Sequence, residues 1–291
     1  MDTPDSLSLE TLDIAANGQR LHALAAGPAD GPLVVLLHGF PETSHGWHRQ
    51  MAPLARAGLR VVAPDQRGIG LSSRPGAVAD YRVDHLAADI VALVRALGRD
   101  RVRIVGHDWG GVVAWRLAGF HADVVERAAI LDAPHPAVFS AYARRHPSQL
   151  AKSWYMALFQ LPWLPEAMLK ARDFRALAKA LVGSSRPGTF TEADLAVYRA
   201  AWSRPGALTA MLNWYRALPL ARELPRRSGA VDIPLRLLWG DLDQALEPGL
   251  AEASMAHCRA GELFRFPTAT HWLQHEEPER VNALLVEFLA G

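Results

Sequence analysis

An aspartate in the middle of a glycine-flanked pentapeptide is the residue of this chain best suited to do chemistry. Asp108 is the centre of Gly-His-Asp-Trp-Gly, which follows a β-branched run at residues 101–105 and precedes a helical pattern at residues 110–118. Strand, Gly-x-nucleophile-x-Gly and helix is the order of a nucleophile elbow, in which a strained turn presents the central side chain. Glycines two residues before and after it let strand and helix pass closely.

The aspartate at this position indicates a different attack from the one that serine would make. Serine would favour acyl transfer, whereas a carboxylate is already ionised near neutral pH and needs no base to activate it. Asp108 therefore favours attack on a saturated carbon. A strand–helix turn that merely contains an aspartate is the alternative.

An acid and a histidine follow Asp108 in the order of a catalytic triad. Asp243 lies just past a buried apolar run, and we favour it over Asp241 because it is farther from the strand end, with room to reach across the site. His271 lies between the last strand pattern, residues 262–266, and a closing helical pattern. The histidine is expected to act as the general base and Asp243 to orient it.

Two backbone amides are expected to form an oxyanion hole next to Asp108. His-Gly-Phe-Pro-Glu begins directly after a buried strand, which places the Phe40 N–H near the end of that strand. The second donor is the amide of Trp109, directly after the nucleophile. A cis bond before Pro41 would give the sharp turn needed there. In the next loop, Arg67 is expected to be a structural ion-pair partner.

The histidines do not form a recognisable metal motif. His271 and His275 are four residues apart, but Trp272 stands where a zinc protease needs glutamate. His45 and His48 lack an evident third ligand. The sequence predicts neither a metal nor a cofactor.

Buried apolar runs alternate with amphipathic helical patterns, which predicts an α/β fold with a mostly parallel sheet. A hairpin is expected first, with strands at residues 7–14 and 19–25 around an Asn-Gly turn. The later strand runs are at residues 32–37, 59–63, 101–105, 128–131, 234–239 and 262–266. Residues 83–97 have the apolar stripe of a helix. Ligands of such sheets bind beyond the carboxyl ends of the strands.

The strand–helix rhythm stops between residues 136 and 228. This stretch contains helical patterns, tryptophans and Pro/Gly breaks, but no convincing strand. It is expected to be an all-helical lid inserted into a core made of residues 1–135 and 229–291.

Composition excludes several classes of partner. The 291 residues carry 31 basic and 30 acidic side chains, a formal net charge of +1, which gives no electrostatic case for nucleic acid. There is one cysteine, Cys258, and no signal-like or membrane-spanning apolar stretch. A cytoplasmic monomer or homodimer without a membrane or nucleic-acid partner is expected.

The motifs together resemble α/β-hydrolase-fold epoxide hydrolases, over nearly the whole chain. They are H-G-F-P-E, D-Q-R-G-x-G-x-S, V-G-H-D-W-G-G and H-W-L-Q-H-E-E-P-E-R, with S-W-Y-M-A-L-F-Q and N-W-Y-R in the lid. The resemblance implies that Tyr155 and Tyr215 bind and protonate the epoxide oxygen while Asp108 attacks carbon. His271 and water then release a vicinal diol from the ester. Thr270 departs from the family's usual glycine, which could tighten the histidine loop.

Four lid aromatics are expected to form an apolar wall around the substrate, although simple packing is an alternative for each: Trp154, Phe159, Trp163 and Trp214.

A haloalkane dehalogenase is the alternative activity, since it shares the fold, the aspartate and a tryptophan after it. The Phe40 side chain, however, lacks a donor for halide, and paired lid tyrosines would have no task. A fluoroacetate-type dehalogenase is a further alternative, but it would need an arginine near Asp108. A non-catalytic binding protein is another, but it would not need the triad and both tyrosines.

Overall fold

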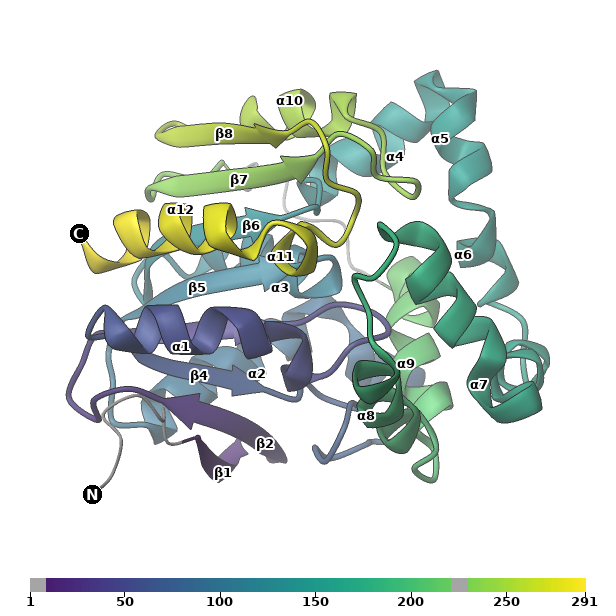
Figure 1. The fold of residues 1–291 in the computed structure, drawn as a ribbon, viewed down its shortest axis with the longest axis horizontal. Helices are drawn as coiled ribbons and strands as arrows, with labels where there is room; N and C mark the ends of the chain where they lie inside the picture. The colour runs from purple at the N-terminus through teal and green to yellow at the C-terminus, as the bar shows by residue number, and fades with distance from the viewer. Residues whose placement is uncertain (1–8, 221–229) are drawn as a thin grey trace.

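The structure, a computed structural model, describes residues 9–220 and 230–291. It contains an eight-stranded sheet in the order β1-β2-β4-β3-β5-β6-β7-β8 (Figure 1). β2 is antiparallel to β1 and β4, and all other neighbours are parallel, which confirms the predicted mostly parallel sheet. The strands are β1 (Glu10–Ala16), β2 (Gln19–Ala26), β3 (Leu33–Leu37), β4 (Arg60–Pro64), β5 (Val102–His107), β6 (Val125–Leu131), β7 (Leu235–Gly240) and β8 (Gly261–Phe266). Residues 7 and 8 of the predicted first strand lie outside the described residues.

Helices cover both faces of the sheet because its central strands are apolar on both sides. In β3, Val34 and Leu36 belong to the core under α1 (His48–Arg56) and α12 (Pro278–Ala290). The intervening side chains of β3 face the other core, with α2 (Val83–Ala96) and α3 (Trp109–Phe120), as the strand period of two requires. α10 (Gly249–Met255) adds Leu250 to the core with α2 and α3, whereas α11 (Leu273–Glu276) adds Leu273 to the core with α1 and α12. Two short 3-10 turns are η1 (Ser44–Trp47) and η2 (Val78–Tyr81).

The described part of the segment between β6 and β7 is built mainly of helices joined by short loops. Residues 136–220 contain no strand, and Figure 1 shows α6 to α9 on the side toward which β5 points. The helices are α4 (Pro136–Arg145), α5 (Pro147–Lys152), α6 (Trp154–Leu158), α7 (Leu164–Ser184), α8 (Glu192–Trp202), α9 (Ala207–Arg216) and the 3-10 turn η3 (Leu218–Leu220). The predicted lid residues 221–228 lie outside the described part. Among the described residues, no helix is long and apolar enough to cross a membrane.

Buried hydrogen bonds fasten this helical segment to the loop after β3. The indole Nε1 of Trp202 donates to the carbonyl oxygen of Pro41 at 2.7 Å, and the Tyr198 hydroxyl donates to Glu42 Oε1 at 2.7 Å. All four groups are shielded from solvent, so these bonds fix the position of α8 over the strand ends.

Arg67 has the structural role predicted from its loop. Its guanidinium forms two hydrogen bonds with the Asp89 carboxylate, at 2.6 and 2.7 Å, and both side chains are buried. The ion pair joins the loop after β4 to α2.

Candidate active site

Asp108 occupies a strained turn between β5 and α3. Its φ of 51° and ψ of −118° are unusual for a residue with a β-carbon. A β-carbon at Gly106 would overlap the backbone of Gly110, and one at Gly110 would overlap the carbonyl of Leu37. The two glycines therefore allow the close crossing of strand and helix that presents the carboxylate.

His271 links Asp108 to Asp243. Its Nδ1 lies 2.7 Å from Asp243 Oδ2, and its Nε2 lies 3.6 Å from Asp108 Oδ2. The other oxygen of Asp243, Oδ1, accepts the amides of Ala245 and Leu246 at 2.6 and 2.9 Å. The loop after β7 thus holds this carboxylate in place, and the carboxylate in turn orients the imidazole.

Asp241, the competing acid, is directed elsewhere. Its Oδ1 accepts a hydrogen bond from Arg265 Nε of β8 at 2.6 Å. The structure therefore brings Asp243 rather than Asp241 to His271.

The two oxygens of the Asp108 carboxylate have different surroundings. The Phe40 amide donates to Oδ1 at 2.8 Å, while Oδ2 faces His271. The Phe40–Pro41 peptide bond is cis, as expected. Trp109 is the first residue of α3, where an amide has no carbonyl partner within its own helix. Both predicted amide donors thus lie next to Asp108, with the Phe40 amide already bonded to it.

Opposite charges fix the protonation states of Asp108 and His271. Burial would raise the pKa of Asp108, but its hydrogen bond and charge interaction with His271 lower it below the ordinary value. Burial would likewise lower the pKa of His271, but the carboxylates of Asp243 and Asp108 hold it well above the ordinary value. The resting site therefore contains an ionised nucleophile beside a positively charged histidine.

A cavity of about 450 Å³ opens over Asp108, a volume typical of a small-molecule site. Tyr155 of α6 and Tyr215 of α9 line it together with Asp108 and Asp132. Much of the remaining lining is apolar and includes Val112, Trp115, Phe120, Phe139, Met156, Leu218 and Leu246. The structure thus places both predicted tyrosines and the predicted nucleophile in one largely apolar space.

Both tyrosines are held in the protonated form. Burial, followed by the negative charge of Asp108, raises the pKa of Tyr155. Burial and the neighbouring Tyr155 and Asp108 raise the pKa of Tyr215 well above its ordinary value. Each hydroxyl can therefore donate a hydrogen bond to an oxygen in the cavity.

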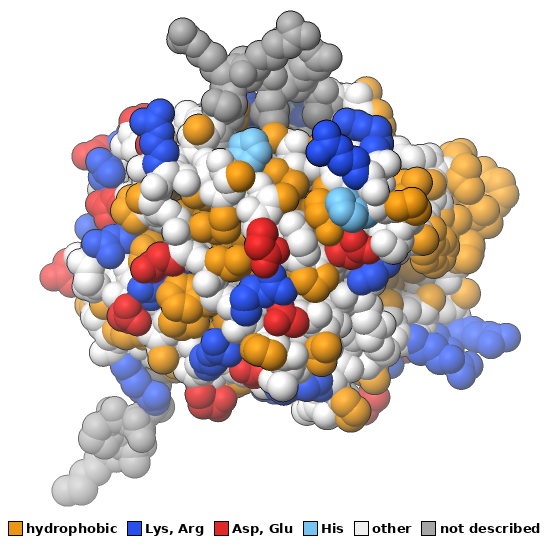
Figure 2. Space-filling view, turned by 90° about the horizontal axis from the view of Figure 1, so that it is seen from above, with side chains coloured by type: hydrophobic (Ala, Val, Ile, Leu, Met, Phe, Trp, Pro, Cys, Tyr) orange, Lys and Arg blue, Asp and Glu red, His pale blue; other side chains and the backbone are white. Residues whose placement is uncertain are grey.

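Two of the predicted pocket aromatics lie on the outer surface. Trp154 is 65% exposed and Trp163 is 74% exposed, and neither lines the cavity. In Figure 2 hydrophobic side chains gather at the right-hand edge of the molecule, the side on which α6 and α7 lie in Figure 1. The expectation that these two tryptophans form the substrate wall is not met, because both side chains are exposed to solvent outside the cavity.

Phe159 and Trp214 pack behind the cavity. The Phe159 ring contacts Phe40, Tyr155 and Tyr215, with ring centroids 5.0 to 5.6 Å apart.

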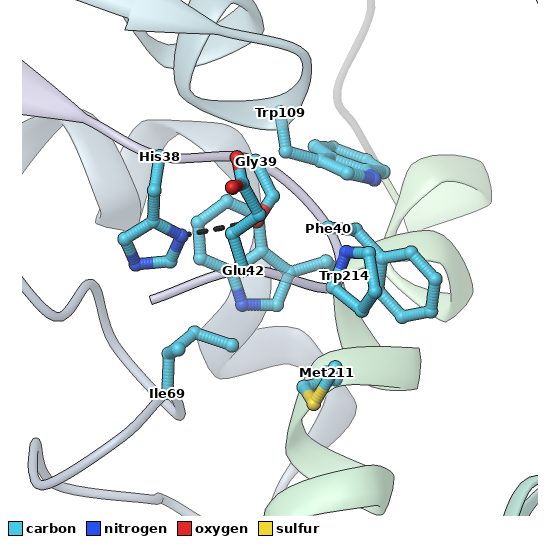
Figure 3. A pocket seen from close by; sticks show the side chains of 9 residues that line it. His38, Gly39, Phe40, Glu42, Ile69, Trp109, Met211 and Trp214 are labelled. Atoms are coloured by element: carbon cyan, nitrogen blue, oxygen red, sulfur yellow. Dashed lines mark hydrogen bonds between the residues drawn. The ribbon is translucent and has the colours of Figure 1, made fainter. Parts of the chain in front are cut away.

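Trp214 lines a separate small pocket of about 10 Å³, next to Met211 and Phe40 (Figure 3). Its indole donates to the carbonyl of Arg67 at 3.1 Å. These two side chains support the residues of the site instead of walling the main cavity, which is the packing alternative considered for them.

A buried glutamate next to the site was not assigned a role from the sequence. Glu42, the last residue of His-Gly-Phe-Pro-Glu, lies 2.7 Å from His275 Nε2 and 3.5 Å from His107 Nδ1. Burial opposes ionisation of Glu42, but the two histidines hold its pKa well below the ordinary value. His107 also bonds the carbonyl of His271 at 2.8 Å. Glu42 therefore supports both loops that carry the reacting groups, and its place in the motif was the available signal.

Thr270 tightens the histidine loop. Its amide and hydroxyl both donate to the Glu276 carboxylate, at 2.8 and 2.7 Å. Glycine at this position could make only the first of these bonds. Thr270 therefore adds one hydrogen bond to the loop next to His271.

The sequence offers no evident third ligand for His45 and His48, but the structure places a carboxylate next to them. Asp194 of α8 lies beside them, with a 2.9 Å contact from its Oδ1 to His45 Nε2, and one donor atom from each residue lies within 4.8 Å of the others. Sequence could not show this because α8 is 149 residues away. These residues also have other protein partners: Arg49 Nε lies 3.3 Å from His48 Nε2, and the Thr191 hydroxyl donates to Asp194 Oδ2 at 2.7 Å.

Comparison with known proteins agrees with this geometry. The alpha/beta hydrolase fold family matches residues 32–278. The chain is 45% identical to the AB hydrolase superfamily protein YfhM of Bacillus subtilis, over 95% of this chain and 96% of that protein. It is 40% identical to Epoxide hydrolase 3 of Xenopus tropicalis, over 94% of this chain and 75% of that protein.

Among solved structures, the Bacillus megaterium epoxide hydrolase in complex with an inhibitor superimposes with a TM-score of 0.88. The two chains are 29% identical, and the match covers 96% of this chain and all of that one. The chain belongs to the epoxide hydrolases of the α/β hydrolase fold.

Proposed function

We propose that the protein converts epoxides to vicinal diols through a covalent ester on Asp108. In the first half-reaction, Asp108 Oδ2 attacks an epoxide carbon from the side opposite the C–O bond that breaks. Tyr155 and Tyr215 bind the oxygen and one of them supplies its proton. As the ester forms, Asp108 loses its negative charge and the epoxide oxygen gains one. The charge of Asp108 raises the pKa of both tyrosines, so its loss makes their protons easier to give at the moment the oxygen needs one.

In the second half-reaction, His271 takes a proton from water, which attacks the carbonyl carbon of the Asp108 ester. Esterification removes one of the two carboxylates that raise the His271 pKa. The imidazolium of the resting site then gives its proton to the tyrosinate left by ring opening, which restores the tyrosine and leaves a neutral imidazole as the base. The amides of Phe40 and Trp109 stabilise the resulting oxyanion at Oδ1. Collapse of this intermediate releases the diol and restores the Asp108 carboxylate.

The observation that carries this proposal is the unequal environment of the two Asp108 oxygens. Oδ1 accepts the Phe40 amide, and Oδ2 lies 3.6 Å from His271 in a cavity shared with two tyrosines. One oxygen is thus placed for nucleophilic attack and the other for the oxyanion that follows.

We further propose that residues 136–228 act as a lid over a core of residues 1–135 and 229–291. The lid supplies both tyrosines and much of the apolar lining, which suits small aromatic or alkyl epoxides. A cytoplasmic location and a monomeric or homodimeric state stay predictions.

Incubation with an aryl epoxide and, separately, with a haloalkane tests the reaction class. We expect diol from the epoxide and no halide release from the haloalkane, because the tyrosines serve a leaving group that needs a proton. Chromatography and halide titration measure the two products. Halide release without diol formation would favour the dehalogenase alternative.

A further inference from the structure

A second buried acid lies next to the triad. Asp132 follows β6 directly, between the strands whose ends lead to Asp108 and Asp243. It is fully buried from solvent and lines the same cavity as Asp108 and the two tyrosines. The mechanism proposed above gives it no task.

The contacts of Asp132 leave half of its carboxyl group unused. Oδ1 accepts the Gly240 amide at 2.8 Å, and the Asp132 amide donates to the Leu238 carbonyl at 3.0 Å. Oδ2 is buried and has no hydrogen-bond partner within residues 9–220 and 230–291. An unpaired buried carboxyl oxygen is costly, so its presence beside a reacting group suggests a role there.

His271 is within reach of this acid. One ring nitrogen each of His107 and His271 and one carboxyl oxygen of Asp132 all lie within 4.8 Å of one another. Burial and the charge of Asp243 raise the pKa of Asp132 well above its ordinary value, while His271 acts in the opposite direction. These influences favour the neutral form of Asp132 in the resting site.

We propose that Asp132 is a second positioning acid for His271, which supports the protonated histidine while the Asp108 ester is hydrolysed. The inference rests on the proposed two-step mechanism. In the first step His271 is flanked by the carboxylates of Asp108 and Asp243. In the second step Asp108 is a neutral ester, so His271 gains a proton when one of its counter-charges is missing. The Asp132 carboxyl group then faces the imidazolium from the neighbouring strand end.

The arrangement also predicts that Asp132 can replace Asp243. In an Asp243→Asn variant the charge that keeps Asp132 neutral is absent, so Asp132 can ionise and become the anion next to His271. Loss of the triad acid can slow catalysis about 10⁴-fold. Because Asp132 can take over the role of the anion next to His271, we expect Asp243→Asn to slow hydrolysis of the ester only about 10²-fold.

The test measures formation and decay of the ester separately, by rapid quenching and mass spectrometry, in Asp132→Asn, Asp243→Asn and the double variant. The asparagine retains an oxygen for the Gly240 amide. Asp132→Asn alone should slow decay several-fold and leave formation near the parental rate. In the Asp243→Asn background the same change should slow decay about 100-fold further. Asp241→Asn, which alters the acid bound to Arg265, is the matched control.

An effect of Asp132→Asn that is no larger in the Asp243→Asn background than in the parent would overturn the proposal. Equal slowing of formation and decay by Asp132→Asn would also overturn it, since that result indicates a structural role. The second criterion needs only the single variant and holds if the double variant does not fold. Failure to detect an ester in any variant would instead reject the proposed function.

Discussion

Replacing Asp108 with alanine should reduce diol formation by about six orders of magnitude, the effect that loss of the nucleophile has in a serine protease. The cavity, the tyrosines and His271 would remain, but no group in the variant could form the ester. Steady-state turnover of an aryl epoxide by the purified variant measures this loss, with the thermal unfolding temperature as a check on folding.

Asp108→Ser should not restore ring opening. A neutral hydroxyl is a weak nucleophile until it loses its proton, whereas the Asp108 carboxylate is ionised in the resting site. Asp241→Asn serves as the matched aspartate variant and should remain near the parental rate. Near-parental diol formation by either Asp108 variant would remove this residue from its proposed role.

Tyr155→Phe and Tyr215→Phe should each slow ring opening about 100-fold, as loss of a single donor to a developing oxyanion commonly does. The double variant should be almost inactive, because the oxygen then has no protein donor. Its rate of ring opening should fall by more than the product of the two single fold reductions. The two hydroxyls act on one atom, so non-additivity is expected. Rapid-quench measurement of ester formation isolates this step from hydrolysis.

Tyr142→Phe provides the matched control, since Tyr142 belongs to α4 and does not line the cavity. It should open the epoxide at the parental rate. If Tyr155→Phe and Tyr215→Phe also behave like the parent, the lid tyrosines have no part in ring opening, and the dehalogenase alternative gains support.

Much of the site's arrangement could be predicted because its residues follow buried strands. Parallel strands have their carboxyl ends at one edge of the sheet, so Asp108 after β5 and residues after β7 and β8 had to lie near one another. Asp243 was preferred over Asp241 by its distance from the strand end, and the structure brings that residue to His271.

Side-chain direction in the lid could not be predicted in the same way. Lid helices are placed by packing against the core, and an aromatic residue suits either a cavity wall or an outer surface. Trp154 and Tyr155 are adjacent on α6, yet Tyr155 lines the cavity and Trp154 faces solvent. The family motif, not the helical pattern, identified the tyrosine.

Contacts between segments that are far apart in the chain could not be predicted from the sequence either. Asp194 meets His45 from α8, and Asp132 reaches the triad although no motif marks it. Both depend on the way that α8 and β6 pack, which no local spacing reports. For Asp132, its position at the end of a predicted buried strand was the one available signal.

The central claim is the ester on Asp108, and a variant that stops after its formation tests it most directly. In His271→Gln, Asp108 and both tyrosines remain, but no base activates water for hydrolysis. The protein should therefore gain the mass of one substrate molecule, and peptide mapping should locate that mass at Asp108.

A single turnover of the parent enzyme in water enriched in heavy oxygen gives the same information without a substitution. The heavy oxygen should enter the Asp108 carboxylate, and the diol should carry an oxygen from the original carboxylate. Direct attack of water on the epoxide would instead label the diol alone and leave His271→Gln without an adduct. That result would contradict the covalent mechanism even for an active epoxide hydrolase.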